Sequence, residues 1–150
     1  MSVRTITFTV YGTPQPAGSK RAFPYRRKDT GKLGIAVSDD NPKAANWKDR
    51  VAQVAGEKMA AWDGELFRGP LRVRFSFSIA RPKGHYGKRG LRASAPPWPD
   101  KKPDALKLSR GTEDALTGVV WRDDAQVVKL GISKEYGTPE GVAITVEEMT

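Results

Sequence analysis

Two short acidic segments stand out, because carboxylates placed in this way can hold a divalent metal ion. Asp104 opens a predicted short helix that runs from about 103 to 116, and the pair Asp123-Asp124 precedes a predicted strand over 125–136. Two or three carboxylate oxygens suit Mg²⁺, or alternatively Mn²⁺, which polarises a phosphate and generates an attacking hydroxide. We expect the two segments to meet at one end of a sheet. The chemistry indicated is metal-assisted phosphodiester hydrolysis.

Spacing alone leaves ordinary structural roles open for the same acids. An Asp at a helix start is most often an N-cap, and paired Asp residues before a strand often form a turn. Other chemistries have little support: the chain has one histidine, His85, and no cysteine. Zinc sites and Ser-His or Cys-His catalysis are therefore nearly excluded.

The predicted elements follow one another in the order β-α-β-α-β-β. Alternating apolar residues predict strands over 3–11, 71–79, 125–136 and 142–148. Apolar positions at helical spacing predict a first helix that ends near Trp62, with Asn41 as its N-cap and Pro42 as its first residue. We expect residues 1–150 to form a single α+β domain with a small mixed sheet and two main helices.

Positive charge is concentrated in two predicted loops, at about 18–32 and 80–103. The net charge is +9, and these segments carry six and seven Lys or Arg residues against one Asp each. The rest of the chain is slightly negative, so the pattern favours a surface that contacts a polyanion. The candidate nucleic-acid contacts are Lys20, Arg21, Arg26, Arg27, Lys83, His85, Lys88, Arg89, Lys102 and Lys107.

The chain lacks the segments that would predict a membrane or secreted protein. No run of eighteen apolar residues is present, and the first residues have no apolar signal-peptide core. We expect a cytoplasmic protein with no membrane partner.

Several strings of the sequence resemble the RusA family of Holliday-junction resolvases, especially its phage-borne members. The strings are Pro103-Asp104-x-x-Lys107-Leu108, Asp114-Ala115-Leu116-Thr117-Gly118-Val119, Trp121-Arg122-Asp123-Asp124-Ala125-Gln126-Val127-Val128, Gly18-Ser19-Lys20-Arg21, Pro82-Lys83-Gly84-His85-Tyr86-Gly87 and Val142-Ala143-Ile144-Thr145-Val146. The resemblance implies a homodimeric, Mg²⁺-dependent endonuclease that makes paired nicks at four-way DNA junctions during recombination and repair. Its setting would be a bacterium or a phage-infected cell, and no nucleotide cofactor is expected.

The resemblance also implies roles for individual residues. The family's first acid matches Asp104, and its late acid matches Asp124, with Asp123 adjacent; these three are the expected metal ligands. The family's basic residue, usually Lys, matches Arg110, which is expected to act in catalysis with Asp104 and Asp124 by contacting the scissile phosphate.

Leu106 occupies the position where the family pattern places a second acid. At about 100° per residue, Leu106 points away from the apolar face of its helix, onto a stripe shared with Arg110 and Glu113. Glu113 is roughly 10 Å further along, which is far for binding the same ion. We therefore predict impaired or absent cleavage with DNA binding retained. A catalytically inactive junction-binding protein, and a basic domain that binds DNA or RNA without junction preference, stay open as alternatives.

Overall fold

A four-stranded sheet forms the centre of the molecule. The computed structural model describes residues 3–17, 20–39, 41 and 43–150, and the side chains of all of these except 20–23 and 36–39. The strands are β1 (Thr5–Tyr11), β4 (Leu71–Ile79), β7 (Val127–Tyr136) and β8 (Gly141–Glu148), in the spatial order β1-β8-β4-β7. β8 is antiparallel to both neighbours, whereas β4 and β7 are parallel. The mixed sheet expected from the sequence is confirmed.

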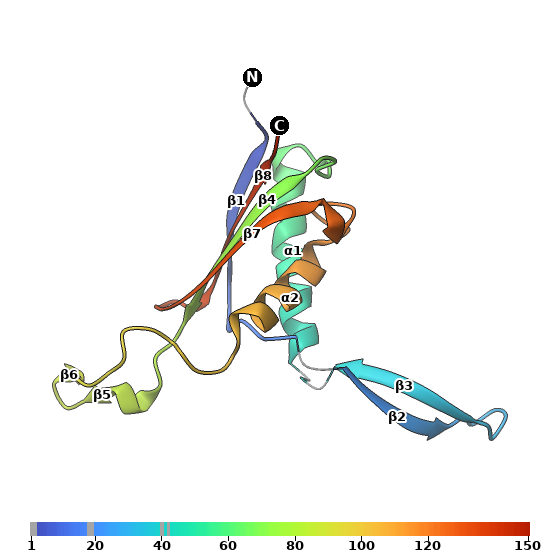
Figure 1. Cartoon of the computed structure of the whole chain (residues 1–150), viewed down its shortest axis with the longest axis horizontal. Helices are drawn as coiled ribbons and strands as arrows, with labels where there is room; N and C mark the ends of the chain where they lie inside the picture. The colour runs from blue at the N-terminus through green and yellow to red at the C-terminus, as the bar shows by residue number, and fades with distance from the viewer. Residues whose placement is uncertain (1–2, 18–19, 40, 42) are drawn as a thin grey trace.

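The two helices cover one face of this sheet (Figure 1), and the core lies between them. Strand alternation places every second residue in this layer, for example Ile6, Phe8 and Val10 on β1, all nearly fully buried. The helices are α1 (Ala44–Trp62) and α2 (Ala105–Leu116). They are joined by a buried hydrogen bond of 3.2 Å from Trp47 Nε1 to Thr112 Oγ1.

The start of α1 differs from the prediction. The N-cap is Lys43 and not Asn41, and its side chain makes no capping hydrogen bond. Asn41 nevertheless supports this entry, since its Oδ1 accepts a hydrogen bond of 3.1 Å from the backbone nitrogen of Lys43. Pro42, expected as the first helical residue, lies outside the described residues.

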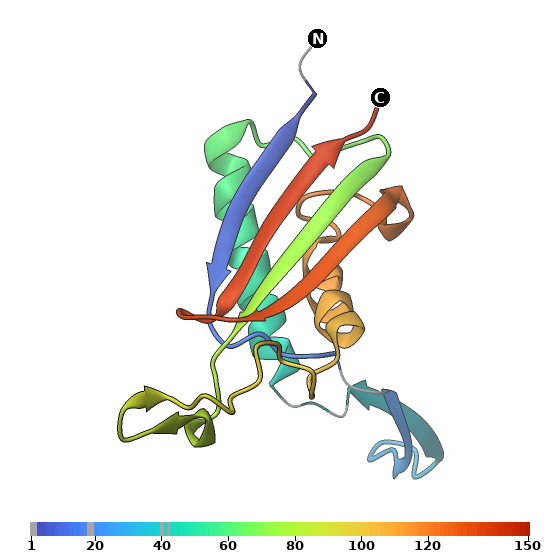
Figure 2. The same cartoon turned by 60° about the vertical axis from the view of Figure 1, so that its left-hand side comes forward.

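The first basic segment is a β-hairpin and not a loop. Strands β2 (Lys20–Arg26) and β3 (Leu33–Asp39) pair antiparallel and project from the body (Figures 1 and 2). The turn between them closes through hydrogen bonds from the nitrogens of Gly31 and Arg27, and Gly31 adopts a φ of 68°. Pro24 and the clustered charges hide the first strand from a hydropathy pattern, since proline in a strand is typical of edges only.

The second basic segment is largely irregular, as expected. It contains the short 3₁₀ helix η1 (Lys83–His85) and the two-residue strands β5 (Tyr86–Gly87) and β6 (Gly90–Leu91). Both basic segments project from the end of the molecule opposite the chain termini (Figure 2), and α2 begins at this same end. Within the described residues, no helix combines the length and apolar character needed to cross a membrane.

Candidate functional site

Asp104 lies directly before α2, and its side chain is exposed. The residue has φ −68° and ψ 139°, and its side chain makes no capping hydrogen bond. Among the described residues its carboxylate has no ion-pair partner either. Asp104 therefore occupies the N-cap position that the sequence left open, but its side chain does not cap the helix. The exposed carboxylate is available to a ligand.

Lys134 fixes the backbone that carries Asp104. Its Nζ donates hydrogen bonds of 2.9 Å to the carbonyl of Lys101 and 3.0 Å to that of Pro103. Sequence reasoning missed this residue. The signal was a charged side chain in register with the apolar residues Ile132 and Tyr136 of β7, where a core-facing residue is expected.

Asp123 and Gln126 build the turn that precedes β7. Asp123 caps the 3₁₀ helix η2 (Asp124–Gln126): its Oδ1 accepts a hydrogen bond of 2.9 Å from Ala125 N. Gln126 Oε1 accepts from Asp123 N at 3.0 Å, which completes a capping box. The Gln126 amide also donates to the carbonyls of Phe67 (3.0 Å) and Gly69 (3.1 Å). The carboxylate of Asp123 thus has a structural task, as the turn alternative anticipated.

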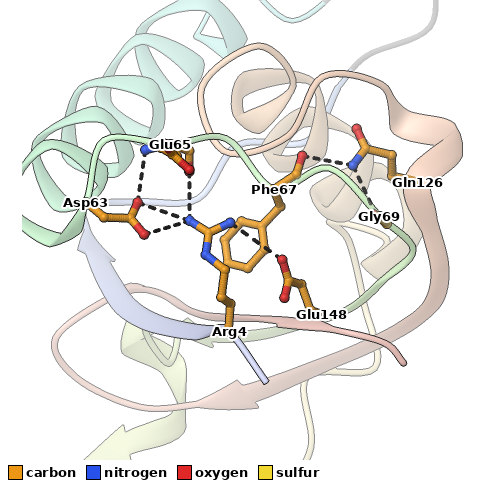
Figure 3. A network of polar contacts seen from close by, with 7 residues as sticks. All are labelled: Arg4, Asp63, Glu65, Phe67, Gly69, Gln126 and Glu148. Carbon is orange, nitrogen blue, oxygen red and sulfur yellow. Dashed lines mark hydrogen bonds and ion pairs between the residues drawn. The ribbon is translucent and has the colours of Figure 1, made fainter. Parts of the chain in front are cut away.

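The chain around Phe67 is anchored in turn by Arg4 (Figure 3). Arg4 binds the Asp63 carboxylate at 2.9 Å and the Glu65 carbonyl at 3.0 Å, and its guanidinium lies 4.5 Å from the centre of the Phe67 ring. The hydrogen bond to the backbone of Glu65, followed by those to Arg4, holds the pKa of Asp63 below its ordinary value. The turn of Asp124 is therefore fastened through Gln126 to a network that joins β1 and the end of α1.

Asp124 lies at the far end of α2, beside other acids. Its carboxylate accepts a hydrogen bond from the hydroxyl of Thr117, and that hydroxyl accepts one of 3.0 Å from the indole of buried Trp121. Burial, with smaller contributions from Asp124 and Asp114, raises the pKa of Glu113 above its ordinary value. Glu113 is therefore electrostatically coupled to Asp124, a relationship that the sequence analysis did not identify.

The expectation that Asp104 and Asp124 meet at one end of the sheet is wrong for a single chain. Asp104 precedes the first residue of α2, and Asp124 binds Thr117, directly after its last residue. A helix of 12 residues spans about 18 Å, which is several times the distance between two oxygens on one metal ion. Across the described part of the chain, no three His, Asp or Glu residues are arranged to hold a metal. The carboxylates of one chain therefore do not fit one shared Mg²⁺ ion.

Leu106 and Arg110 lie where the helical periodicity predicted. Leu106 is 71% exposed, and Leu108, Thr112, Ala115 and Leu116 form the buried face instead. Arg110 is exposed, with no ion pair to any described residue. Leucine at position 106 therefore contributes little to the core. The exposed guanidinium group of Arg110 lies one helical turn away.

The candidate contacts of the first basic segment lie on the projecting hairpin. Arg26 and Arg27 are exposed near its tip, where Arg27 forms a solvent-exposed ion pair of 3.6 Å with Asp29. The side chains of Lys20 and Arg21 lie outside the described residues. A projecting ribbon with exposed cations at its tip suits contact with a phosphate backbone.

The second basic segment is held to the sheet through Tyr136. The Arg81 guanidinium lies 4.3 Å from the centre of the Tyr136 ring, and His85 meets the same ring edge-on at 5.4 Å. Arg81 Nη1 also donates to the Pro96 carbonyl at 2.8 Å and approaches His85 Nδ1 at 3.3 Å. His85 is thus half-buried in an anchor. The remaining candidates on and after this segment are exposed except for the half-buried Lys107; they are Lys83, Lys88, Arg89, Lys102 and Lys107.

The chain is similar to known proteins over nearly its whole length. The sequence profile of a family described as "Endodeoxyribonuclease RusA" matches residues 14–147, nearly the whole chain. The chain belongs to the RusA family. It is also 29% identical over 148 residues to "Uncharacterized protein YqaN" of Bacillus subtilis (strain 168), and the match covers 97% of each chain.

The two acidic segments of this RusA-family chain differ in their hydrogen bonds. Asp123 and Gln126, in the most distinctive segment of the resemblance to RusA proteins, are occupied in holding a turn. Asp104 and Asp124 take no part in that capping box and lie at opposite ends of one helix. The residues that sequence reasoning missed, Lys134 and Thr117, support these two acids by hydrogen bonds.

Proposed function

We propose that this RusA-family chain is a structure-selective endonuclease that nicks four-way DNA junctions in recombination and repair. The observation that carries the proposal is the family match over residues 14–147. The position of Asp104 supports it, because this exposed carboxylate lies at the end of the molecule from which both basic segments project (Figure 2).

The basic segments would bind the phosphates of the junction. Arg26 and Arg27 on the hairpin, and Lys88 and Arg89 between β5 and β6, extend on separate arms to either side of the α2 start. Two separated arms suit a branched polyanion better than a single groove does, and their cations bind through counterion release. Arg110, exposed on α2, is suited to stabilise the negative charge that develops on the scissile phosphate.

Dependence on Mg²⁺, with Mn²⁺ as a substitute, belongs to the proposal on the strength of the resemblance. The carboxylates of one chain do not surround one ion, so no step of the reaction is assigned to a metal. Action as a homodimer in the cytoplasm of a bacterium or phage-infected cell is proposed on the same ground, since paired nicks at a two-fold junction need two sites.

In this proposal, Leu106 affects the cutting of DNA and not its binding. An exposed leucine cannot donate a carboxylate, so we expect weak cleavage by the natural chain and full binding of junctions. The second candidate is a junction-binding protein without nuclease activity. It is favoured specifically by Leu106, which is 71% exposed at a position where the family pattern places an acid.

Nicking of a synthetic four-way junction in Mg²⁺ and in Mn²⁺ tests both candidates. The natural chain, Leu106→Asp and the double variant Leu106→Asp/Asp104→Asn are compared. We expect Leu106→Asp to cut at least ten times faster than the natural chain, and the double variant to bind without cutting. Equal rates for Leu106→Asp and the natural chain would contradict the role given to Leu106. If no variant cuts while all bind, the non-catalytic candidate is correct.

Binding is measured in parallel on four-way and linear duplex DNA at the same stated salt concentration. A clear preference for the junction is expected. Equal affinity for the two forms would leave only a basic nucleic-acid-binding domain, because the phosphate contribution is blind to DNA shape.

A further inference from the structure

An open cleft of about 440 Å³ lies between the end of β1 and the start of α1, outside the candidate site and outside both basic segments. None of the described residues that line it is acidic, and four of them carry N–H donors: Gln15, Lys43, Asn46 and Arg50. We propose that this cleft binds a phosphate group of the DNA backbone, as a third contact beside the two basic segments. The inference rests on the proposed function and adds a place to its DNA-binding surface.

Helical spacing aligns the donors on α1. Lys43 is the N-cap of the helix, and Asn46 and Arg50 follow it at positions i+3 and i+7, so the three side chains lie along one stripe. Trp47, on the same stripe, is buried and fastens α1 to α2 through its hydrogen bond of 3.2 Å to Thr112. One side of the cleft is therefore a row of hydrogen-bond donors on a firmly packed helix.

Arg50 is fixed in place by the backbone of the opposite wall. Its Nε donates a hydrogen bond to the carbonyl of Tyr11. The guanidinium also lies against Gly12, where a Cβ atom would come within 3.3 Å of Nε, and the φ of 132° at this position favours glycine. A guanidinium held through Nε keeps its two outer nitrogens as donors for a ligand.

The two cations of the cleft have no acid to neutralise them. In the described part of the chain, neither Lys43 nor Arg50 forms an ion pair. Glu140 contacts the adjacent backbone, but its carboxylate accepts a hydrogen bond of 3.3 Å from Thr13 and does not line the cleft. Two cations and two amides suit an anion that offers several oxygens, and a phosphate group accepts such charge-assisted hydrogen bonds strongly.

The shape and place of the cleft favour a phosphate of DNA over a free phosphorylated molecule. A small-ligand pocket buries roughly 70–90% of its ligand, whereas Lys43, Asn46 and Arg50 are all exposed. The cleft lies at the end of the molecule from which both basic segments project (Figure 2), and α1 begins at Ala44, five residues after β3 ends at Asp39. A DNA strand held by the hairpin can therefore continue across the cleft.

The wall of the cleft that contains Gln15 is also attached to α2. Ala17 N donates a hydrogen bond of 2.9 Å to the carbonyl of Lys107. Gly111 packs so closely against the same segment that a Cβ atom there would lie 3.2 Å from the carbonyl oxygen of Gln15. A phosphate bound in the cleft would therefore hold the DNA at a fixed offset from Asp104, which precedes α2.

The salt dependence of junction binding tests the contact. Lys43→Gln should weaken binding to a four-way junction roughly threefold to tenfold, and it should lower the slope of log affinity against log salt concentration by about one. The matched control is Lys58→Gln, which makes the same charge change at an exposed position in the far half of α1 and should alter neither quantity. An unchanged slope for Lys43→Gln, or an equal loss for Lys58→Gln, would overturn the proposal.

A second substitution separates lost binding from lost folding. Asn46→Asp places a carboxylate in the cleft, and an acid in the first turn of a helix favours the helix. This variant should melt no lower than the natural chain and yet bind the junction more weakly than Lys58→Gln, which has the same net charge. Binding equal to that of Lys58→Gln would contradict a phosphate in the cleft.

Photocrosslinking locates the DNA directly, because the chain contains no cysteine. Asn46→Cys labelled with a benzophenone maleimide should crosslink to junction DNA, and Lys58→Cys labelled in the same way should not. Inorganic phosphate and a deoxynucleoside monophosphate are added alone in a thermal-shift assay. If either raises the Tm of the natural chain but not of Lys43→Gln, while junction binding by the two chains is the same, the ligand is a free phosphorylated molecule and the assignment to DNA is wrong.

These measurements also distinguish a failure of this inference from a failure of the proposed function. Junction binding by the natural chain with an unchanged slope for Lys43→Gln removes the third contact alone. Loss of the contact in Lys43→Gln without any nicking by Leu106→Asp removes the nuclease function and keeps the cleft. A natural chain that binds no DNA would overturn both.

Discussion

The turn that carries Asp124 should depend on one side chain, Gln126. Its amide oxygen accepts hydrogen bonds of 2.9 Å and 3.0 Å from the nitrogens of Arg122 and Asp123, and its nitrogen donates to the carbonyls of Phe67 and Gly69. Gln126→Ala removes all four. A neutral hydrogen bond contributes about 0.5–1.5 kcal/mol net, and an orphaned buried group costs more than an exposed one.

The two halves of this network do not cost the same when they are lost. Arg122 and Asp123 are exposed, so water replaces their bonds at little cost, whereas Phe67 is fully buried and its carbonyl loses its side-chain donor. We therefore expect Gln126→Ala to lower the free energy of unfolding by roughly 2–3 kcal/mol. For a domain of this size that is a fall in Tm of about 5–10 °C.

Urea unfolding followed by tryptophan fluorescence measures this loss, since Trp121 is buried next to the turn. Gln126→Glu is the matched control: it keeps the volume and the two accepted bonds but sets a carboxylate oxygen against the Phe67 and Gly69 carbonyls. It should destabilise the chain at pH 7 at least as much as alanine, and less at a pH where the carboxyl is protonated. A Gln126→Ala chain within about 0.5 kcal/mol of the parent would refute the structural role of this amide.

Three further outcomes follow from the same contacts. Leu106→Asp should leave Tm within about 2 °C of the parent, because the leucine is mostly exposed and an acid in the first turn favours the helix; a larger fall by calorimetry would mean that Leu106 packs. Glu113→Gln should raise Tm at pH 7 and not at pH 3, because a carboxyl whose pKa is raised above 4.5 on folding costs stability only above that value; an equal rise at both pH values would contradict this. Lys134→Met should lower nicking by the Leu106→Asp chain while circular dichroism stays unchanged, because Lys134 holds the backbone before Asp104; undiminished nicking would exclude that role.

The regular elements could be predicted because each has its own period. Strands β1, β4 and β8 show alternation, and α2 shows a buried face that excludes Leu106. The hairpin could not be predicted in full, because Pro24 and its charged neighbours interrupt the pattern of β2 and its pairing with β3 depends on contacts made across the turn. A regular spacing of apolar residues arises where one face of an element is buried against a core. This hairpin projects away from the core (Figure 1) and has no such spacing.

The candidate site could likewise be predicted only in part. Residue types and the resemblance identified Asp104 and Asp124, but their separation depends on where α2 ends and how η2 turns back, which is set by hydrogen bonds from Thr117 and Gln126. Lys134 was missed because it is distant in sequence from Pro103, whose carbonyl it binds next to Asp104. Glu113 was missed because its proximity to Asp124 arises only when the chain after α2 turns back. Sequence similarity in the segment around Asp123 and Gln126 therefore reports the fold, since these side chains form the capping box of a turn.

The nicking activity proposed for this chain depends on other positions, which lie outside the turn. A chain can keep Asp123 and Gln126, and with them the family's fold, while position 106 changes from an acid to an exposed leucine at almost no cost in stability. Selection on folding does not act against such a change, because the side chain contacts solvent and not the core. In this chain, the residues at the two ends of α2 are therefore the ones to substitute when the proposed cutting is to be separated from binding.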